Sequence, residues 1–291
     1  MSPQPQSRQS LRASGSRAIH RIHVPTPRAR RPRAHLIHIG KTGGTALKSA
    51  LTPVLHDGDY EIVLHGHGTR LKHVPVGEKV FFVIRDPVDR FVSGFNSRLR
   101  RGRPRYDIPW TPEEELAFEQ FATPDQLGAA LSSEDSIERA RAFQAMTSIG
   151  HVRASYWQWF HHRYLVQKRM DDLLLVMWFP ALSTGFAQLC DLLGLPEGVC
   201  LPGDDVGSHR SPDTADRSLS PLARTNLERW YGADVAFVEF CSGLSCFAGS
   251  SPSEETQLKG QVPLEASRPA SSSAGLTECH LSRAVTPAVG Y

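Results

Sequence analysis

The stretch HLIHIGKTGGTALKSAL, residues 35–51, constrains the fold of this chain more than any other part of the sequence. An apolar run at 35–39 precedes a turn that holds Lys41 and two glycines, and apolar residues at helical spacing follow. A strand that leads through such a turn into a helix places free backbone N–H groups and the positive end of a helix dipole at one point. That point favours an anion.

The residue types in this turn suit a single phosphate group. Two glycines let the backbone approach a phosphate closely, a lysine adds positive charge, and two hydroxyls add donors. These residues are Lys41, Thr42, Gly43, Gly44 and Thr45. A triphosphate loop needs the order GxxxxGK[ST], whereas here Gly40 directly precedes the lysine and the glycines follow it. A tight turn with a solvated lysine is the alternative.

A second turn of the same kind follows the apolar run KVFFVI, residues 79–84. Arg85 stands where this strand should end, a proline opens a helix, and Ser93 lies about two turns into that helix. A planar guanidinium suits a terminal phosphate, and the hydroxyl adds a second donor. The alternative is an ion pair in which Arg85 pins the loop through Asp86 or Asp89.

Together the motifs KTGGT and RDPVDRFVS resemble those of the sulfotransferases that use 3′-phosphoadenosine 5′-phosphosulfate, especially the carbohydrate-type group. The resemblance implies that residues 41–45 bind the 5′-phosphosulfate and that Arg85 and Ser93 bind the 3′-phosphate. It also implies a P-loop-like fold. The chain departs from the family pattern at Gly40, where proline is usual.

Sulfuryl transfer needs a base that takes the proton of the attacking hydroxyl and whose pKa lies near neutrality. The stretch VLHGHGTRL, residues 63–71, places His65 and His67 on one side of the end of a predicted strand. It is similar to the HGH of the uronyl 2-O-type sulfotransferases, which implies His67 as the base and His65 as a supporting residue. Lys41 completes the expected catalytic set. Metal binding or ordinary loop histidines are the alternatives, and Glu61 is the fallback base.

Three further segments are candidates for substrate contacts. An arginine-rich run after the second turn is either a solvated helix end or a seat for an anionic acceptor such as a uronate. Its members are Arg98, Arg100, Arg101, Arg103 and Arg105. Segment 151–165 interleaves aromatic and basic side chains, which indicates either core or a stacking surface for sugar or adenine. The run GSHRSP resembles the family's polar loop near the nucleotide, which implies contacts from His209, Arg210 and Ser211.

Four apolar runs are typical of buried strands, and helical patterns lie between and after them. The strands are expected at 35–39, 60–65, 79–84 and 173–179. The helices are expected at 45–55, from 87, at 183–193 and from 221 towards 240. This alternation predicts an α/β fold, a P-loop-like parallel sheet flanked by helices.

One domain, residues 34–248, is expected between two disordered ends, 1–33 and 249–291. The first 33 residues hold eight arginines and no acidic residue, and the last segment is rich in Ser, Pro, Ala and Gly. The formal net charge of +3 therefore becomes about −5 once this basic arm is left aside, so nucleic acid is not an expected partner. An organelle transit peptide is the alternative interpretation of the arm.

The chain is expected in the cytoplasm as a soluble protein. It contains no apolar core of a secretory signal and no run of the ~18 apolar residues that a membrane span requires. The longest apolar run, 172–182, is interrupted by Pro180. The five cysteines form no CxxC pair and have no histidine at metal-ligand spacing, which predicts reduced thiols and no metal site.

These observations predict a sulfotransferase that moves a sulfuryl group from 3′-phosphoadenosine 5′-phosphosulfate to an acceptor hydroxyl on a carbohydrate. The reaction needs no metal. A nucleotide kinase or NTPase is one alternative, and it would need a Walker-type loop and an Asp for magnesium. A nucleotide-binding protein without catalytic activity is the other.

Overall fold

The computed structural model describes residues 31–203 and 216–249. Most of the predicted basic arm, the candidate contacts His209, Arg210 and Ser211, and the predicted tail from residue 250 lie outside the described residues. The first strand begins at Arg33, inside the range predicted as the arm. Arg31 is also engaged, since its guanidinium donates to the carbonyl oxygen of Gly58 over 3.0 Å.

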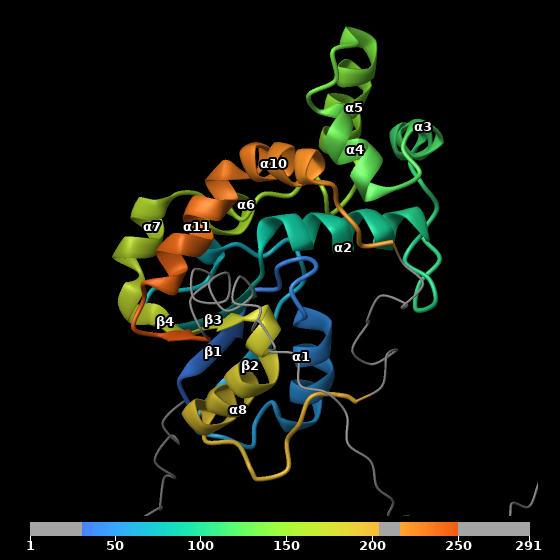
Figure 1. Cartoon of the computed structure of the whole chain (residues 1–291). Helices are drawn as coiled ribbons and strands as arrows, with labels where there is room; N and C mark the ends of the chain where they lie inside the picture. The colour runs from blue at the N-terminus through green and yellow to red at the C-terminus, as the bar shows by residue number, and fades with distance from the viewer. Residues whose placement is uncertain (1–30, 204–215, 250–291) are drawn as a thin grey trace, which may run out of the picture. The chain divides into compact units, whose positions relative to one another are not determined.

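A parallel sheet of five strands forms the centre of the described part, in the order β2-β1-β3-β4-β5 (Figure 1). The strands are β1 Arg33–Leu36, β2 Glu61–Leu64, β3 Lys79–Ile84, β4 Leu173–Trp178 and β5 Phe247–Ala248. The predicted α/β class is therefore confirmed, and this topology is compatible with P-loop-like folds. The first strand lies earlier than the predicted run, although Ile37 N–H still donates to the Phe81 carbonyl oxygen over 3.1 Å.

The strand order creates a switch point between β1 and β3. The chain leaves β1 for its neighbour β2 on one side and later returns as β3 on the other. In open parallel sheets, ligands bind outside the carboxyl ends of the strands at such a point. The two turns singled out in the sequence follow β1 and β3, so the fold brings both to this edge.

Ten α-helices surround the sheet in the described ranges. They are α1 Gly44–Leu51, α2 Pro87–Leu99, α3 Pro112–Gln120, α4 Pro124–Ala130, α5 Ser136–Ser148, α6 Trp157–Phe160, α7 Arg163–Lys168, α8 Leu182–Leu193, α10 Pro221–Trp230 and α11 Gly232–Ser242. Short 3₁₀ turns lie at Thr52–Val54, Leu71–His73, Met170–Asp172 and Phe179–Ala181. The last predicted helix is divided in two, because the chain turns at Tyr231 between α10 and α11.

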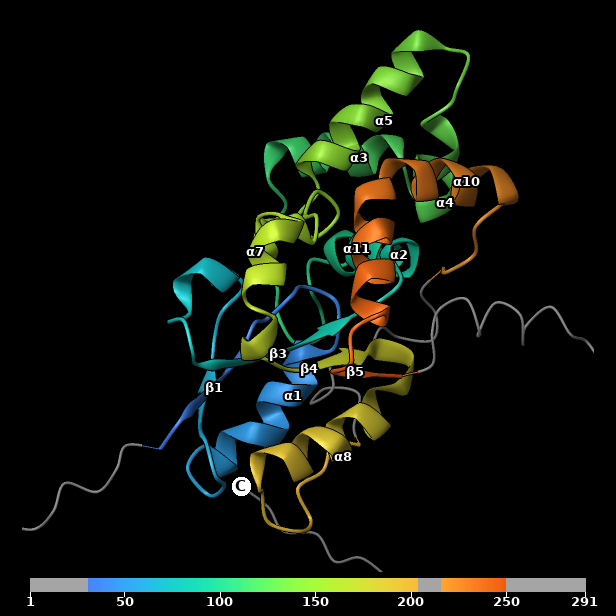
Figure 2. The ribbon, with the colours of Figure 1, turned by 90° about the vertical axis from the view of Figure 1, so that its left-hand side faces the viewer.

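Each face of the sheet has its own hydrophobic core (Figure 2). Helices α1 and α8 cover one face with Leu47, Leu51 and Phe186 among others, against Leu36 and Phe81 of the strands. Helices α6, α7 and α11 cover the opposite face, where Phe160, Val166 and Phe237 pack on Phe82 and Val176. Buried side chains alternate between these two faces along β1 and β3, as strand geometry requires.

A third core lies where α2 meets α3, α4, α5 and α10, and Figure 1 shows α2 between the sheet and this group of helices. Phe91 and Phe95 of α2 contribute to it together with Phe118, Leu127 and Met146. Helices α3, α4 and α5 were not predicted, because their apolar stripes are weak. Their capping signals were nevertheless present: Thr111 and Thr123 begin α3 and α4 as capping boxes, each followed by proline.

Two sequence expectations can be compared with the described residues directly. Cys190, Cys200, Cys241 and Cys246 are unpaired thiols, as predicted, while Cys279 lies outside the described residues. Among the described helices, none has the length and apolar character needed to cross a bilayer.

Candidate functional site

The turn after β1 leaves the start of α1 open to an anion. Gly43 is the N-cap residue with φ +88°, no side chain caps the helix, and its first turn holds no acidic residue. Ala46 N–H donates to the Gly43 carbonyl oxygen over 3.0 Å, and the N–H groups of Gly44 and Thr45 have no intrahelical partner. Gly44 is needed for packing, since a Cβ there would lie 2.2 Å from Cδ2 of His38. Thr42 is buried, and its hydroxyl donates to the Ile39 carbonyl oxygen over 3.0 Å.

Lys41 is the charged group of this turn. Its backbone is left-handed, with φ +67°, which a residue other than glycine seldom adopts. Burial lowers the pKa of Lys41 to about 8, and the positive charges of Arg100 and Arg85 add to this effect. The structure therefore brings together the cations of the two turns that the sequence singled out, Lys41 and Arg85.

Arg85 follows β3 directly and is held through its backbone. The hydroxyl of Tyr156 accepts from the Arg85 N–H over 2.9 Å and donates to the Arg85 carbonyl oxygen over 2.7 Å. The guanidinium lies over the ring of Phe179, 4.4 Å from its centroid, and its buried Nε has no hydrogen-bond partner among the described residues. Ser93 lies half-buried in α2. Burial lowers the pKa of Arg85, opposed by the charge of Asp89.

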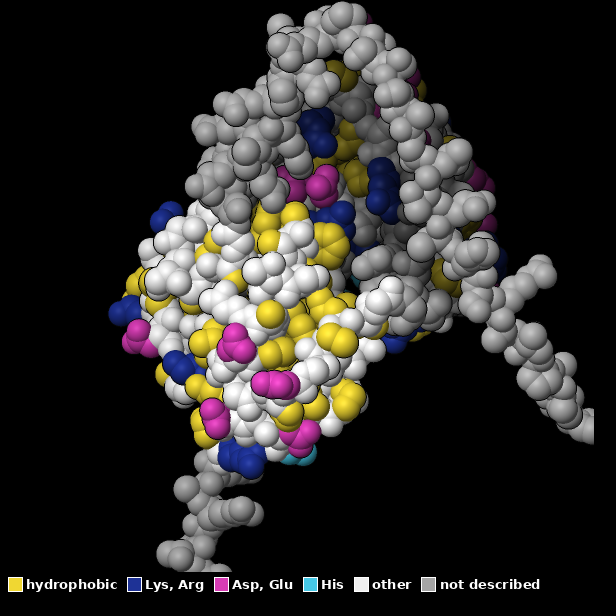
Figure 3. Space-filling view, turned by 60° about the horizontal axis from the view of Figure 1, so that its bottom comes forward, with side chains coloured by type: hydrophobic (Ala, Val, Ile, Leu, Met, Phe, Trp, Pro, Cys, Tyr) yellow, Lys and Arg dark blue, Asp and Glu magenta, His cyan; other side chains and the backbone are white. Residues whose placement is uncertain are grey.

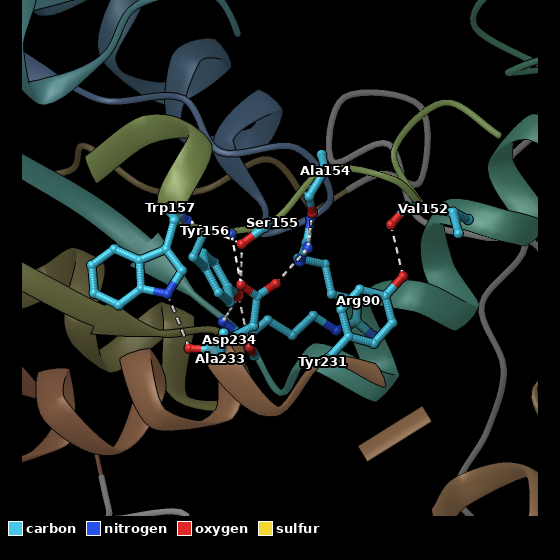
Figure 4. Close-up of polar contacts among 10 residues, drawn as sticks. Arg90, Val152, Ala154, Ser155, Tyr156, Trp157, Tyr231, Ala233 and Asp234 are labelled. Carbon is cyan, nitrogen blue, oxygen red and sulfur yellow. Dashed lines mark hydrogen bonds and ion pairs between the residues drawn. The ribbon is translucent and has the colours of Figure 1, made fainter. Parts of the chain in front are cut away.

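A buried ion pair supports this region from beneath (Figure 4). Arg90 of α2 and Asp234 of α11 are each 1% exposed, and Arg90 Nη2 lies 3.2 Å from Asp234 Oδ2. The same carboxylate accepts from the Tyr156 N–H over 3.0 Å and from the Ser155 hydroxyl. Because the Tyr156 hydroxyl binds Arg85, the pair fixes the position of the second turn as well.

Further cations surround Lys41 and Arg85. Arg217 lies close enough to lower the pKa of both Arg85 and Arg100. Figure 3 shows one face of the molecule on which several Lys and Arg side chains lie together with acidic side chains among them. Neighbouring positive charges repel one another, and a bound anion would offset this repulsion. The cluster of cations near Lys41 and Arg85 therefore favours an anionic ligand.

The arginine-rich run after α2 is only partly available for such a ligand. Arg98 is buried and forms an ion pair with Glu114, with Arg98 Nε 2.7 Å from Glu114 Oε1. Arg101 lies over the ring of Trp110, and Arg103 pairs with Asp107 over 2.8 Å. Arg105 lies over Tyr106. Arg98 therefore belongs to the third core, and Arg100 is the member of the run that lies near Lys41.

His67 is held by its main chain and by one ring nitrogen. Trp159 Nε1 donates to the His67 carbonyl oxygen over 2.9 Å, and His67 Nδ1 lies 3.1 Å from the carbonyl oxygen of His38. A carbonyl oxygen only accepts, so Nδ1 carries the proton and Nε2 is the basic nitrogen of the neutral ring. Partial burial lowers the pKa of His67, the charges of Lys48 and Lys41 add to this, and the bond to His38 opposes it.

His65 belongs to a different chain of contacts. His65 Nε2 lies 2.8 Å from Nδ1 of His35, whose Nε2 lies 2.6 Å from Oε2 of Glu78. The rings of His35 and His65 are stacked with centroids 5.1 Å apart. Burial is the main cause of the lowered pKa of His65, and the charges of His35 and Lys48 lower it further. The fallback base, Glu61, instead pairs with Arg33 over 2.9 Å at the start of β2.

Sequence reasoning missed two histidines beside His67. The ring of His38, at the end of the first apolar run, lies 3.9 Å from that of His67, and His151 approaches it edge-on at 6.0 Å. Burial, reinforced by neighbouring positive charge, lowers the pKa of each to about 3. The polar residue inside a strand pattern was the available signal for His38. His151 belongs to the candidate segment 151–165, but no local signal placed it beside His67, because only the folded chain brings it to this edge.

The aromatic segment 151–165 serves mainly as core. Tyr156, Trp159 and Phe160 are buried on the α11 side of the sheet, and Trp157 Nε1 donates to the Ala233 carbonyl oxygen over 3.1 Å. Within the described residues, no group of three or more His, Cys, Asp or Glu side chains is arranged to hold a metal ion.

The site thus comprises the turn with Lys41 at the start of α1, a second cation at Arg85, and an oriented histidine, His67, at one edge of the sheet. No protein-family model matches this chain, and a search of curated proteins finds no match.

Proposed function

We propose that the protein is a sulfotransferase that moves a sulfuryl group from 3′-phosphoadenosine 5′-phosphosulfate to an acceptor hydroxyl. The observation that supports this most directly is the convergence of Lys41 and Arg85 at the switch point of the sheet. Two separate cationic turns suit a ligand with two separate phosphate groups, as this donor has.

The chemistry of the first turn fits the 5′-phosphosulfate. When the acceptor oxygen attacks sulfur, a new S–O bond forms and the bond from sulfur to the bridging oxygen breaks. The electron pair of that bond remains on the 5′-phosphate, whose new negative charge Lys41 and the N–H groups of residues 43–45 neutralise. Thr42 contributes through its backbone, because its hydroxyl proton is used within the turn.

The acceptor loses its proton to His67. Nε2 is the basic nitrogen in the tautomer that the His38 carbonyl oxygen selects, so it accepts the hydroxyl proton as the S–O bond forms. His65 is a supporting residue in this proposal, held in place by His35. All atoms and charges are thereby accounted for without a metal ion in the step.

The second turn fits the 3′-phosphate. The unpartnered Nε of Arg85 is the kind of buried donor that a bound phosphate oxygen satisfies. Ser93 of α2 adds a hydroxyl, and His209, Arg210 and Ser211 complete the proposed nucleotide contacts from outside the described residues. The acceptor class that we propose is a carbohydrate, and the cations around Arg100 favour an anionic one.

The decisive experiment follows labelled sulfate from the donor to a panel of neutral and anionic glycans, with lipids and small phenols included. We expect a labelled glycan, formed equally well in the presence of a chelator of divalent cations. Phosphate transfer from ATP that depends on magnesium would instead identify a kinase or NTPase. Tight binding of adenosine 3′,5′-bisphosphate with no turnover on any acceptor would identify a binding protein and overturn the proposal.

A further inference from the structure

The ring of His151 occupies a slot that two glycines leave open. A Cβ on Gly40 would lie 3.1 Å from His151 Nδ1, and a Cβ on Gly94 would lie 3.1 Å from His151 Cβ. Gly40 immediately precedes Lys41, and Gly94 immediately follows Ser93. A side chain at Gly40 would crowd the imidazole, and one at Gly94 would crowd Cβ and the backbone of His151, so both glycines leave room for this residue.

The backbone at His151 is held in a costly conformation. Its φ is +66°, in the left-handed region that a non-glycine residue seldom adopts. Contacts on both sides maintain it: Gly150 N–H donates to Glu114 Oε1 over 2.9 Å, and the Val152 carbonyl oxygen accepts from the Tyr231 hydroxyl over 2.7 Å. Strain that the surroundings maintain in this way is concentrated at functional sites.

The side chain lies beside both reacting ends of the proposed transfer. Its ring centroid is 6.0 Å from that of His67, at an interplanar angle of 69°. Gly40, the residue before Lys41, lies against His151 Nδ1, and after burial the charge of Lys41 is the largest influence on the pKa of His151. His151 is half-buried, and its ring nitrogens form no hydrogen bond among the described residues.

We propose that His151 is a further catalytic residue, which donates a hydrogen bond to an oxygen of the sulfuryl group during transfer. This inference rests on the proposed function. The sulfur must pass between the leaving oxygen, which Lys41 neutralises, and the attacking oxygen, which His67 deprotonates. A group adjacent to both Lys41 and His67 therefore faces the sulfuryl oxygens.

The protonation state suits this task. Burial and the charges of Lys41 and His67 hold the pKa of His151 at about 3, so its ring is neutral and keeps one N–H donor at physiological pH. His151 neither gives up nor accepts a proton in the step. The acceptor proton still goes to His67, so the two imidazoles have separate roles.

The test compares two His151 variants with two matched controls. His151→Gly removes the ring without backbone strain, and His151→Asn keeps an N–H donor on a residue that tolerates left-handed φ. His161 is the matched control, because it is an exposed histidine with φ +68° at the end of α6. The readouts are labelled-sulfate turnover, affinity for adenosine 3′,5′-bisphosphate and the melting temperature.

We expect His151→Gly to lower turnover about 10²-fold, as the loss of one donor to a developing charge does. His151→Asn should recover part of this loss. Affinity for the bisphosphate, which has no sulfuryl group, should stay within about twofold of the wild type by the same reasoning. The His161 variants should leave turnover and affinity unchanged.

Two results would overturn this inference and leave the proposed function standing. The first is full turnover by His151→Gly. The second is a loss of turnover accompanied by a proportional loss of affinity for the bisphosphate. The second result would mean that the ring only supports the nucleotide site. A wild-type protein that transfers no sulfate to any acceptor would overturn the proposed function together with this inference, so the two failures are distinguishable.

Discussion

His35 Nδ1 lies 2.8 Å from His65 Nε2, and this contact gives the two histidines of the HGH stretch opposite tautomers. Glu78 accepts from His35 Nε2, so when the His35 ring is neutral its Nδ1 accepts and His65 Nε2 donates. The basic nitrogen of His65 is then Nδ1, whereas that of His67 is Nε2. The two rings are therefore not interchangeable as bases.

This difference predicts distinct effects for variants of the two histidines. His67→Ala should lower turnover about 10²–10⁴-fold, the usual contribution of a positioned base, and leave bisphosphate affinity nearly intact. His65→Ala should lower turnover by a smaller factor than His67→Ala. Glu78→Gln, which acts on His65 through His35, should leave most activity in place. A severe loss in both His65→Ala and Glu78→Gln, with an active His67→Ala, would transfer the role of base to His65.

The pH profile of kcat/KM should be bell-shaped. His67 must be neutral to accept a proton, so activity rises with pH through its pKa, which burial places below the ordinary value of about 6.5. Lys41 must be charged, and its pKa of about 8 in the free protein predicts a fall in activity above that pH. Initial rates at low donor concentration across this range provide the measurement. The absence of a fall above about pH 8 would contradict the Lys41 assignment, and the absence of any rise below about pH 6.5 would contradict the His67 assignment.

Lys41→Ala should reduce turnover more than donor binding, because the lysine charge matters most when the bridging oxygen becomes negative. By analogy with one oxyanion donor, the cost is about 2.7–4 kcal/mol in the barrier. Lys168→Ala is the matched control, since Lys168 is an exposed lysine at the end of α7. Normal turnover by Lys41→Ala in the labelled-sulfate assay would rule out this role.

Arg85 should distinguish the number of phosphate groups on a nucleotide. We expect adenosine 3′,5′-bisphosphate to bind more tightly than adenosine 5′-phosphate, by the ~1.5–3 kcal/mol of a charge-assisted hydrogen bond. Arg85→Gln should remove most of that difference, while Arg103→Gln, in an exposed ion pair, should not. Calorimetry with both nucleotides measures this difference in affinity. Equal affinities of the wild type for the two nucleotides would remove the basis for the second phosphate site.

The buried pair of Arg90 and Asp234 should dominate stability at the junction of α2 and α11. Asp234→Asn leaves the charge of Arg90 buried without a full counter-charge, which we expect to cost about 3–5 kcal/mol in the free energy of unfolding. Asp107→Asn, in the exposed pair with Arg103, is the control and should have little effect. Urea unfolding of both variants tests this, and equal midpoints would contradict the prediction.

Local patterns identified most of the sheet. The strand at 79–84 has the predicted bounds because all but one of its residues are buried, which makes the run continuously apolar. The strand β5 has two residues, too few for any periodicity. The glycine and proline signals at the two proposed phosphate-binding turns were likewise local, and they placed both turns at the same sheet edge.

The remainder of the site depends on contacts between distant parts of the chain. His151 and Arg217 come from distant parts of the chain: Gly94 of α2 lies against His151, and Asn96 of α2 donates to the carbonyl oxygen of Asp216, next to Arg217. The burial of Arg98 depends on its ion pair with Glu114. Glu114 lies in α3, a helix that the pattern of apolar residues did not predict. Residue types and spacing contain no information on such pairings unless the tertiary fold is known.

The separation of Arg90 and Asp234 along the chain affects how the protein is made. Asp234 follows Arg90 by 144 residues, so both phosphate turns leave the ribosome long before the carboxylate that completes their support. Until α11 has been synthesised, Arg90 cannot be buried without leaving its charge uncompensated. The N-terminal half should therefore remain incompletely packed during translation, and binding competence should arise only when the last helix of the domain docks.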